Sequence, residues 1–464
     1  MNMENDKIIQ LLKEENNKIY LVGGVVRDYI LGRKNYDKDI IVIDEEAKIF
    51  AQRFAQKHSA TCVTLDEVNN IYRVCMPDKI NYIDITNPIN NSLEDDIKRR
   101  DLTINAVAIN LHSGEYLDIV GGVEDIKNRI IQAISEENFV DDPLRILRAY
   151  RFASTLGFEI EYGTKDIIKR HLNIVLNPAV ERRNVEILKL FGGKYADKIL
   201  LDMDKIGLVE KLFTTMTDVK KVPFNTHHHL DLFHHSVETV KQIQIIYEKS
   251  SKEVQEHLSR VDFGGDTRLA HLKFAGFLHD IGKYSTWTIE DDGRHRFIRH
   301  DEVGADMAKK LLKQNKFSKK QIEYISFIIR HHIYPSSVIS APEINDKIYM
   351  RYIRKAEENA IDLITIAKAD RLSAQGVAIT QEMTEANINA LDKLQEFYIK
   401  IKPTLKPVPK LLDGEEIMRV LDIKPSKELG LIIKELHQAQ LDGVVNTKED
   451  AIKFITKLKH TLAF

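Results

Sequence analysis

The chain has 464 residues, of which 43% are hydrophobic and 30% are charged, and its formal net charge is −2. One hydrophobic core rarely serves a chain of this length, so we expect several globular domains. The balanced charge excludes a protein that is basic throughout, so any contact with nucleic acid must come from local basic patches. The N-terminus is charged, and no apolar run is long enough to cross a bilayer, so we expect a cytoplasmic protein with no membrane partner.

The first 135 residues combine short apolar strands with helices. Ile19–Val22 is predicted to be a strand that runs into two glycines, and residues 39–43 form a second apolar run. Residues 83–85 alternate with polar neighbours, which is typical of a third strand. We therefore predict an α+β protein whose N-terminal head, residues 1–135, holds a mixed sheet.

After the head the apolar pattern becomes helical, and we expect no further strands from about residue 136. Apolar residues recur at i, i+3, i+4 and i+7 within residues 144–158 and 181–191, as on one face of a helix. A histidine-rich stretch at 226–240 opens a second helical region, and residues 401–410, with three of the eleven prolines, predict a linker. The predicted parts are an all-α neck at 136–200, a second helical domain at 201–400 and a helical tail at 401–464.

Two short motifs near the start of the chain indicate phosphate and metal chemistry. The run LVGGVVRDYILG at 21–32 places two glycines between a strand and a helix, where backbone N–H groups suit a phosphate. Arg27, one turn into that helix, can pair with a triphosphate oxygen. Asp37 and Asp39 lie two apart on the next strand, so both carboxylates face one side and can hold magnesium ions.

Each motif alone is commonplace, because a Gly-Gly pair is more often a simple turn and an Asp-x-Asp pair more often a solvated strand edge. Their order on strand, turn, helix and strand favours the functional interpretation. The predicted phosphate and metal site consists of Gly23, Gly24, Arg27, Asp37 and Asp39.

These motifs resemble the head-domain signature of the class II tRNA nucleotidyltransferases and bacterial poly(A) polymerases. The resemblance continues in chain order: KRRDLTINA at 98–106 looks like the RRDxTxNA element, DDPLRILRAYRF at 141–152 like the base-reading neck motif, and ERRNVE at 181–186 like the element that steadies the neck helix. It implies that the 3′-hydroxyl of an RNA attacks the α-phosphate of CTP or ATP and that pyrophosphate leaves. It also implies Mg²⁺ on the paired aspartates and a nucleotide-facing Arg100.

The neck motif supplies the predicted base-reading residues. On a helix, Asp142 and Arg145 would share one face, where a carboxylate and a guanidinium offer an acceptor and donors to a Watson–Crick edge. Such a pair selects cytosine or adenine without a nucleic-acid template, and Arg148, one turn on, extends the face toward phosphate. The alternative for this stretch alone is a surface ion pair on an amphipathic helix, which contributes little.

The second helical domain carries histidines and aspartates in the order His…His-Asp…His…His…Asp. Imidazole and carboxylate groups are the expected ligands of a hydrolytic divalent metal site, and this order resembles the HD phosphohydrolase superfamily. The resemblance implies a primary ligand set that takes Mg, Mn or Ni, and a second metal on His300 with either His331 or His332, of which we favour His332. A purely structural domain remains the alternative. The implied ligands are His235, His279, Asp280, Asp370, His300 and His332.

The resemblance implies a tRNA 3′-end nucleotidyltransferase that completes CCA from CTP and ATP, with phosphatase or 2′,3′-cyclic phosphodiesterase activity as a hypothesis for the HD domain. The C-terminal unit resembles the tail that supports tRNA in this family. Only NPINN separates YIDIT from SLEDD, where CCA-adding members commonly carry a longer loop, and a short connection is stiffer. Addition of CC alone therefore remains an alternative.

Two other functions stay open. One is a poly(A) polymerase, although the C-terminus KLKHTLAF carries only a short basic run, and the other is an HD phosphohydrolase with an RNA-binding head. The paired carboxylates disfavour the latter, because a binding module has no need of them. The sequence does not decide between CCA, CC, A alone and poly(A) as the product, and it leaves the oligomeric state open.

Overall fold

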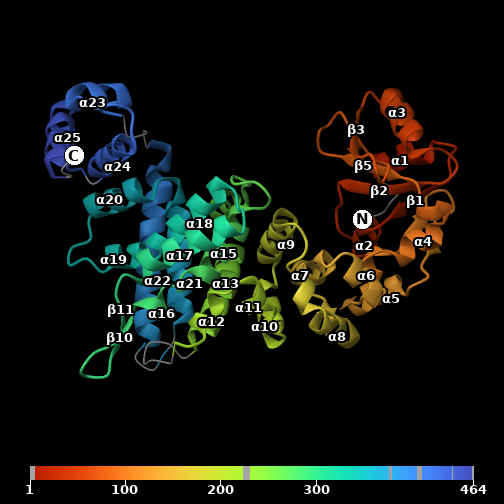
Figure 1. Ribbon diagram of the computed structural model, residues 1–464, viewed down its shortest axis with the longest axis horizontal. Helices are drawn as coiled ribbons and strands as arrows, with labels where there is room; N and C mark the ends of the chain where they lie inside the picture. The colour runs from red at the N-terminus through yellow and green to blue at the C-terminus, as the bar shows by residue number, and fades with distance from the viewer. Residues whose placement is uncertain are drawn as a thin grey trace. The chain divides into compact units, whose positions relative to one another are not determined.

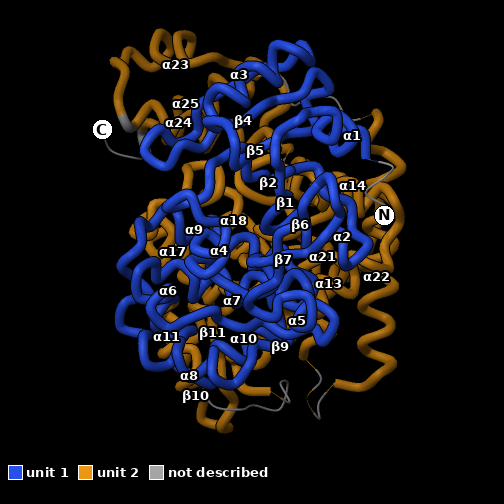
Figure 2. Tube along the Cα trace, turned by 90° about the vertical axis from the view of Figure 1, so that its right-hand side faces the viewer, with its two compact units in different colours: residues 1–212 blue, residues 213–464 orange. Residues whose placement is uncertain are grey.

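The computed structural model describes residues 6–222, 230–374, 376, 379–404, 410–441 and 443–461 of the chain. The chain divides into two compact units, Met1–Leu212 and Phe213–Phe464, which Figure 2 shows in different colours. The main sheet lies in the first unit and helices dominate the second, so the predicted α+β class is confirmed. No helix among the described residues is long and apolar enough to span a membrane.

The centre of the first unit is a seven-stranded sheet (Figure 1), made of β1 (Ile19–Val22), β2 (Asp37–Val42), β3 (Thr61–Asp66), β4 (Ile71–Cys75), β5 (Tyr82–Thr86), β6 (Ala108–Asn110) and β7 (Tyr116–Leu117). Its order is β3-β4-β5-β2-β1-β6-β7. Strands β2 and β5 run parallel and the other neighbouring pairs are antiparallel, as predicted for a mixed sheet. Ile40, Ile41 and Val42 are buried in succession, because β2 lies inside the sheet with both faces covered.

Short helices accompany this sheet. Of the two predicted glycines, Gly23 forms the turn after β1 and Gly24 is the first residue of α2. Helix α3 packs against β3, β4 and β5 and buries Phe50 and Phe54. The helices of the head are α1 (Lys7–Lys13), α2 (Gly24–Ile30), α3 (Ala47–Lys57), α4 (Leu93–Lys98) and α5 (Gly122–Asn128).

The rest of the first unit is largely helical, with α6 (Glu136–Asp141), α7 (Leu144–Leu156), α8 (Tyr162–Arg170), α9 (Val180–Gly192), α10 (Ala196–Lys205) and α11 (Leu208–Leu212). The expectation of no strands after residue 136 is wrong. Strand β8 (Ile130–Ile131) pairs in parallel with β9 (Glu159–Ile160), and in the second unit β10 (Trp287–Ile289) pairs with β11 (His295–Phe297). Strands of two or three residues are too short to show an alternating pattern.

Helices α15 (Arg268–Leu278) and α21 (Ala360–Ser373) are deeply buried in the second unit. Every residue of α15 is buried, and so is nearly all of α21, because α13 (Leu232–Lys249) and α18 (Lys319–His331) cover them. Charged side chains are buried with them, and Arg268 of α15 pairs with Asp362 of α21 at 3.0 Å, as a buried charge requires. The other helices here are α12 (Met216–Val219), α14 (Lys252–Ser259), α16 (Lys283–Thr286), α17 (His300–Gln314), α19 (Tyr334–Ile339), α20 (Asp346–Ala356) and α22 (Gln381–Ile401).

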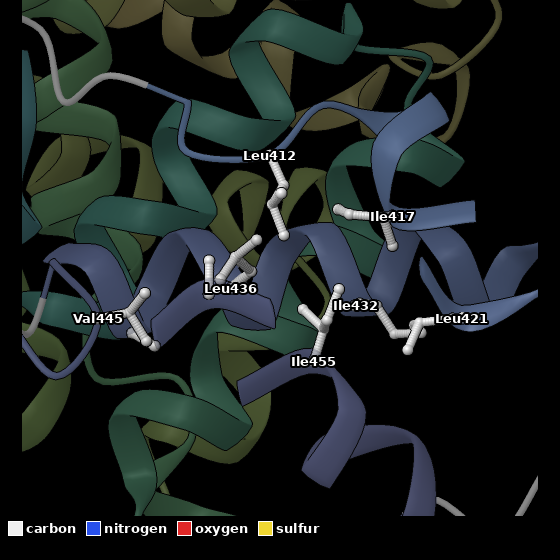
Figure 3. Packing of buried hydrophobic residues seen from close by; sticks show 9 residues of the cluster. Leu412, Ile417, Leu421, Ile432, Leu436, Val445 and Ile455 are labelled. Atoms are coloured by element: carbon white, nitrogen blue, oxygen red, sulfur yellow. The ribbon is translucent and has the colours of Figure 1, made fainter. Parts of the chain in front are cut away.

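The C-terminal tail is helical, as predicted, and has a small hydrophobic core of its own (Figure 3). It consists of α23 (Gly414–Leu421), α24 (Lys427–Leu441) and α25 (Lys448–Thr461). Residues 405–409 of the predicted linker lie outside the described residues. The side chains of the tail core in Figure 3 include Leu412, Ile417, Leu421, Ile432, Leu436, Val445 and Ile455.

Candidate functional site

Asp37 and Asp39 face a cavity of about 520 Å³ in the first unit, together with Gly23, Gly24 and Arg27. The two carboxylates share one face of β2, as alternation along a strand predicts, whereas the buried Lys38 between them lies on the other face. The cavity thus collects all five residues of the predicted phosphate and metal site. The other described residues that line it are Val25, Asn35, Asp96, Arg99, Arg100, Asp101, Asn105, Asp142, Arg145, Arg148, Arg151, Phe152 and Arg182.

Gly23 has a φ of 76°, in the left-handed region that favours glycine. A Cβ atom at this position would lie 3.1 Å from Nη1 of Arg100 and 3.2 Å from Oδ2 of Asp39. The glycine therefore allows the turn between β1 and α2 to pass close to both an acidic and a basic side chain of the cavity. A larger residue would have to displace one of them.

The pKa of Asp39 is raised to about 6. Burial is the largest cause and the negative charges of Asp84 and Asp37 add to it, while Arg100 and Arg73 act in the opposite direction. A divalent cation would relieve this accumulation of negative charge, and carboxylate oxygens are the ligands that Mg²⁺ prefers. The paired aspartates of β2 therefore fit the predicted metal.

Asp84 is a third carboxylate beside this pair, and the sequence analysis did not identify it. The parallel register of β2 and β5 places Asp84 opposite Asp39, and Arg73 of β4 lies opposite Asp84 in turn. Arg73 donates from Nε and Nη2 to the two carboxylate oxygens of Asp84, both at 2.7 Å. The sequence does show a charged residue in the middle of the apolar strand YIDIT, which is unusual. Only the strand register shows that this residue, Asp84, lies beside Asp39.

Arg27 and Arg100 reach the cavity from different segments and meet at Asn105. Nη1 of Arg27 donates to Oδ1 of Asn105 at 2.6 Å, and Nη1 of Arg100 donates to the backbone oxygen of Asn105 at 3.3 Å. Arg27 also donates from Nη2 to Asp28, and Arg100 from Nη2 to Asp96, both at 2.9 Å. Both guanidinium groups are thus held at the cavity wall by protein acceptors, which is the kind of preorganisation that a phosphate site needs.

The prediction that Asp142 and Arg145 share a helix face is wrong. Asp142 lies between α6 and α7 in an extended conformation, with φ −131° and ψ 91°, because Pro143 disfavours the helical region for the residue before it. Its carboxylate accepts from the backbone N–H of Leu144 at 3.2 Å and from Nη2 of Arg182 at 2.9 Å. Asp142 still lines the cavity together with Arg145, so a turn rather than helix periodicity brings the two residues there.

Arg145 and Arg148 lie one turn apart on α7 and both line the cavity. Nη1 of Arg145 donates to the backbone oxygen of Arg100 at 3.1 Å, and Nε of Arg148 donates to Oδ2 of Asp101 at 2.7 Å. Burial alone would raise the pKa of Asp101, but the charge and hydrogen bond of Arg148 hold it below its ordinary value. The neck helix is therefore bonded directly to the KRRDLTINA segment.

The ERRNVE element lies on α9, which packs along α7. Glu186 accepts from Nε of Arg151 of α7 at 2.9 Å. Arg182, which the sequence analysis did not single out, binds Asp142 at the start of the same neck segment. These contacts tie α9 to the segment predicted to read the base, which agrees with the steadying role that the resemblance implies.

In the second unit, the predicted metal ligands converge on Asp280. His235 of α13 and His279 at the end of α15 lie 3.3 Å apart at Nε2, and Oδ2 of Asp280 is 3.5 and 3.2 Å from them. His300 and His332 lie 3.3 Å apart at Nε2, and Oδ1 of Asp280 is 3.4 and 4.0 Å from them. Asp280 therefore stands between two groups of side chains, each of which can hold a metal ion.

Asp370 of α21 joins the first group, with its Oδ1 at 3.0 Å from Nε2 of His235. In His279, His300 and His332 the Nδ1 atom bonds to the carbonyl oxygen three residues earlier, at 2.7, 2.9 and 2.6 Å respectively. A neutral imidazole that donates from Nδ1 keeps the lone pair of Nε2 for a metal, and this arrangement is common in metal-ligating histidines.

Of the two adjacent histidines, His332 is the one that reaches this centre. It is 1% exposed, and burial together with the charges of His279 and His300 lowers its pKa to about 3, so its imidazole is neutral as metal binding requires. His331 instead packs its ring against Phe327, with the centroids 4.6 Å apart. The structure thus gathers the six predicted ligands and directs His331 elsewhere.

Comparison with known proteins finds three families along the chain. Residues 19–132 match the poly A polymerase head domain, and residues 157–219 match the probable RNA and SrmB-binding site of polymerase A. Residues 232–375 match the HD domain. The first match contains Asp37, Asp39 and both glycines of the cavity, and the last contains the six converging histidines and aspartates.

Two relatives match nearly the whole chain at 29% identity. They are the A-adding tRNA nucleotidyltransferase of Deinococcus radiodurans, over 94% of each chain, and the CC-adding tRNA nucleotidyltransferase of Thermus thermophilus, over 94% of this chain and 92% of its own. The solved structure of the Thermotoga maritima CCA-adding enzyme complexed with tRNA-CCA has the same fold, with a TM-score of 0.56 and 21% identity over 99% of this chain and 96% of its own. The chain therefore contains a poly A polymerase head domain, a region that matches the RNA-binding site of polymerase A and an HD domain, and along nearly its whole length it is similar to tRNA nucleotidyltransferases.

Proposed function

We propose that the protein is a tRNA nucleotidyltransferase that adds nucleotides from CTP and ATP to the 3′ end of tRNA and completes CCA without a nucleic-acid template. One observation carries this proposal: arginines from three separate segments, Arg27, Arg100 and Arg145, converge with Asp37 and Asp39 on one cavity. The carboxylates suit metal ions, and the guanidinium groups suit a triphosphate and a base. The two relatives that match nearly the whole chain are named for adding A or CC to tRNA, which supports tRNA as the RNA.

In this proposal the head, residues 1–135, performs the transfer and the neck, residues 136–200, reads the base. The tail, residues 401–464, supports tRNA, and the HD unit, residues 201–400, has its own metal chemistry. We place the protein in the cytoplasm, because the proposed substrates belong there.

Asp37 and Asp39 would hold Mg²⁺, which lowers the pKa of the attacking 3′-hydroxyl and offsets charge on the α-phosphate. Arg27 and Arg100 would bind the phosphates of the incoming nucleotide, since protein acceptors already orient both groups at the cavity wall. Arg148 extends this basic surface along α7. The residues themselves therefore bind and align the two substrates for an in-line displacement.

Asp142 and Arg145 would read the base. On the Watson–Crick edge, cytosine (N4, N3) and adenine (N6, N1) present an amino donor beside a ring-nitrogen acceptor, whereas uracil (O4, N3–H) and guanine (O6, N1–H) present an acceptor beside a donor at the same positions. A carboxylate only accepts hydrogen bonds and a guanidinium only donates them, so a carboxylate facing the amino group and a guanidinium facing the ring nitrogen match the first two bases and not the others. Asp142 can accept from a base while it keeps its bonds to Leu144 and Arg182, because a carboxylate has about four acceptor positions.

The connection between β5 and α4 favours a second candidate product, CC alone. Asn87 starts this connection, and its Nδ2 donates to the backbone oxygens of Val42 and Glu45, both at 2.8 Å. Its Oδ1 accepts from the backbone N–H of Ala47, also at 2.8 Å. A short loop anchored in this way at its first residue has little freedom to move, and a switch from CTP to ATP that needs such movement would be lost.

The test uses tRNA that lacks its last three nucleotides and the same tRNA ending in CC, each with CTP, ATP or both. Formation of CCA is the expected result. Termination after CC favours the second candidate, and addition of A only to the CC-ending tRNA indicates an A-adding enzyme. Long A tracts indicate a poly(A) polymerase, and no incorporation on any substrate would overturn the proposal.

For the second unit we propose a metal-dependent phosphohydrolase that acts on RNA ends as a phosphatase or 2′,3′-cyclic phosphodiesterase. The convergence of imidazoles and carboxylates on Asp280 supports this activity, and Mg²⁺, Mn²⁺ and Ni²⁺ are the candidate metals. Hydrolysis of 2′,3′-cyclic AMP and release of phosphate from a 3′-phosphorylated RNA are measured with each metal, for the natural protein and for His279→Ala. We expect the natural protein to turn over a substrate and His279→Ala to have lost this activity. If no metal supports turnover, the second unit has a structural role instead.

A further inference from the structure

A buried lysine lies between the two aspartates that face the cavity. Lys38 is 1% exposed, although the other buried residues of β2 are Ile40, Ile41 and Val42. Burying a charged side chain is unfavourable unless it is paired, and an aliphatic residue fills such a position in a strand equally well. Packing therefore does not explain why a lysine stands here.

The partner of Lys38 comes from the N-terminal segment. Nζ of Lys38 lies 2.9 Å from Oδ2 of Asp6 and donates to the backbone oxygen of Asn35 at 2.5 Å. Asp6 is itself fixed, because its Oδ2 accepts from the hydroxyl of Tyr29 at 3.0 Å and its Oδ1 accepts from the backbone N–H of Ile8 at 3.0 Å. The ion pair thus joins the start of α1, helix α2 and strand β2.

The contacts continue from Lys38 to Arg27. Asn35, whose carbonyl oxygen Lys38 binds, donates from Nδ2 to Oδ2 of Asp28 at 2.8 Å. Oδ1 of Asp28 accepts from Nε and Nη2 of Arg27 at 3.1 and 2.9 Å. One buried ammonium group therefore lies on the strand of the metal-binding candidates and connects, through two side chains, to the guanidinium proposed for phosphate.

We propose that Lys38 is a positioning residue for nucleotidyl transfer: paired with Asp6, it sets the Asp37–Asp39 strand and Arg27 relative to one another. The inference rests on the proposed function, because it concerns the same site. A buried ion pair often adds little net stability, yet it can select one geometry among several. The pair should therefore affect metal affinity and turnover beyond any effect on folding.

The experiment compares Lys38→Met, Asp6→Asn and the double variant in the full chain. It measures kcat, the KM for tRNA, the Mg²⁺ concentration for half-maximal incorporation, and the rise in unfolding temperature that Mg²⁺ produces. Each single variant is expected to lower kcat about tenfold and to raise the half-saturating Mg²⁺ severalfold, with the KM for tRNA unchanged. Because the two residues act as a pair, the double variant should be no worse than Lys38→Met alone.

Asp6→Asn keeps an oxygen that can cap α1, so it tests the inference even where Lys38→Met fails to fold. Lys57→Met is the matched control: Nζ of Lys57 pairs with the buried Glu15 at 2.6 Å in the same unit, and neither residue is among the described residues that line the cavity. This variant should leave kcat and the half-saturating Mg²⁺ of the folded protein unchanged.

The inference is wrong if the Lys38 and Asp6 variants lose activity only in proportion to the folded fraction, or if their losses add in the double variant. An unchanged Mg²⁺-dependent rise in unfolding temperature would also overturn it, and that readout needs no turnover. The two failures are distinguishable, because absence of incorporation by the natural protein counts against the proposed function itself.

Discussion

The two candidate metal sites of this chain differ in how their charges are arranged before any ligand binds. In the first unit, acids and arginines line an open cavity, and the arginines are held by acceptors such as Asn105 and Asp101. In the second unit, most of the candidate ligands lie in the interior: His235 and His279 are 0% exposed and Asp280 is 1% exposed, whereas His300 and Asp370 are partly exposed. The first arrangement leaves room for large charged substrates, and the second brings together side chains that could hold a metal ion.

The ligand types follow the same division. Carboxylate oxygens on β2 suit a hard cation such as Mg²⁺, which keeps several waters and binds substrate phosphates as well. Imidazoles whose orientation is fixed by hydrogen bonds to backbone carbonyls suit transition metals, and such metals are bound more by the protein than by the substrate. We therefore expect the first site to depend on added Mg²⁺ and the second to bind a metal ion more tightly.

The largest effect is expected from removing a carboxylate of the open site. Asp39→Asn should lower kcat/KM for CTP incorporation by roughly three orders of magnitude or more, because a metal ligand acts on the reacting atoms themselves. The measurement is incorporation into tRNA that lacks CCA. Robust incorporation by a folded Asp39→Asn protein would contradict the assignment of the metal site.

The same substitution should stabilise the metal-free protein at neutral pH. Because the folded-state pKa of Asp39 is raised from 3.8 to about 6, its ionisation opposes folding; this penalty is absent below about pH 4 and fully present above about pH 6. At about 1.4 kcal/mol per pKa unit, the gain in free energy of unfolding is up to about 3 kcal/mol at pH 7.5 and about 1 kcal/mol at pH 4.5. Chemical denaturation at both pH values in the absence of Mg²⁺ measures it, and a variant no more stable than the natural protein at pH 7.5 speaks against the raised pKa.

In the buried site, His332→Ala should weaken metal binding roughly 10- to 100-fold, because it removes one ligand from a group whose side chains are already oriented. His331→Ala is the matched control, since its ring packs on Phe327, and it should change the affinity less than about twofold. Titration calorimetry with Mn²⁺ or Ni²⁺ compares the two. Equal losses in both variants would contradict the placement of His332 as the ligand.

The smallest effect concerns the choice of base. Asp142→Ala should reduce the preference for CTP over UTP about tenfold, because the carboxylate that accepts from the exocyclic amino group is lost. The neighbouring exposed Asp141 lies outside the described lining of the cavity, so Asp141→Ala serves as the control. The ratio of kcat/KM for the two nucleotides is measured, and an unchanged ratio in Asp142→Ala would remove Asp142 from base reading.

Much of the head could be predicted because its signals are local. Strand β1 has the predicted bounds, Ile19–Val22, and Asp37 and Asp39 share the predicted face, since both features depend only on alternation along one strand. The extended conformation of Asp142 could also be predicted from the sequence, because Pro143 follows it directly. A helix that includes Asp142 starts two residues too early, because α7 begins at Leu144.

The sequence by itself determined the local elements, the order of the motifs and the set of residues able to bind metal and phosphate. Only the tertiary structure decided that Asp84 lies beside Asp39, that Arg182 binds Asp142 and that Asp6 pairs with Lys38. It also decided which of two adjacent histidines reaches Asp280. Periodicity shows which side chains share a face of one element, but strand register and helix packing arise from contacts between residues far apart in the chain, and those contacts choose each partner.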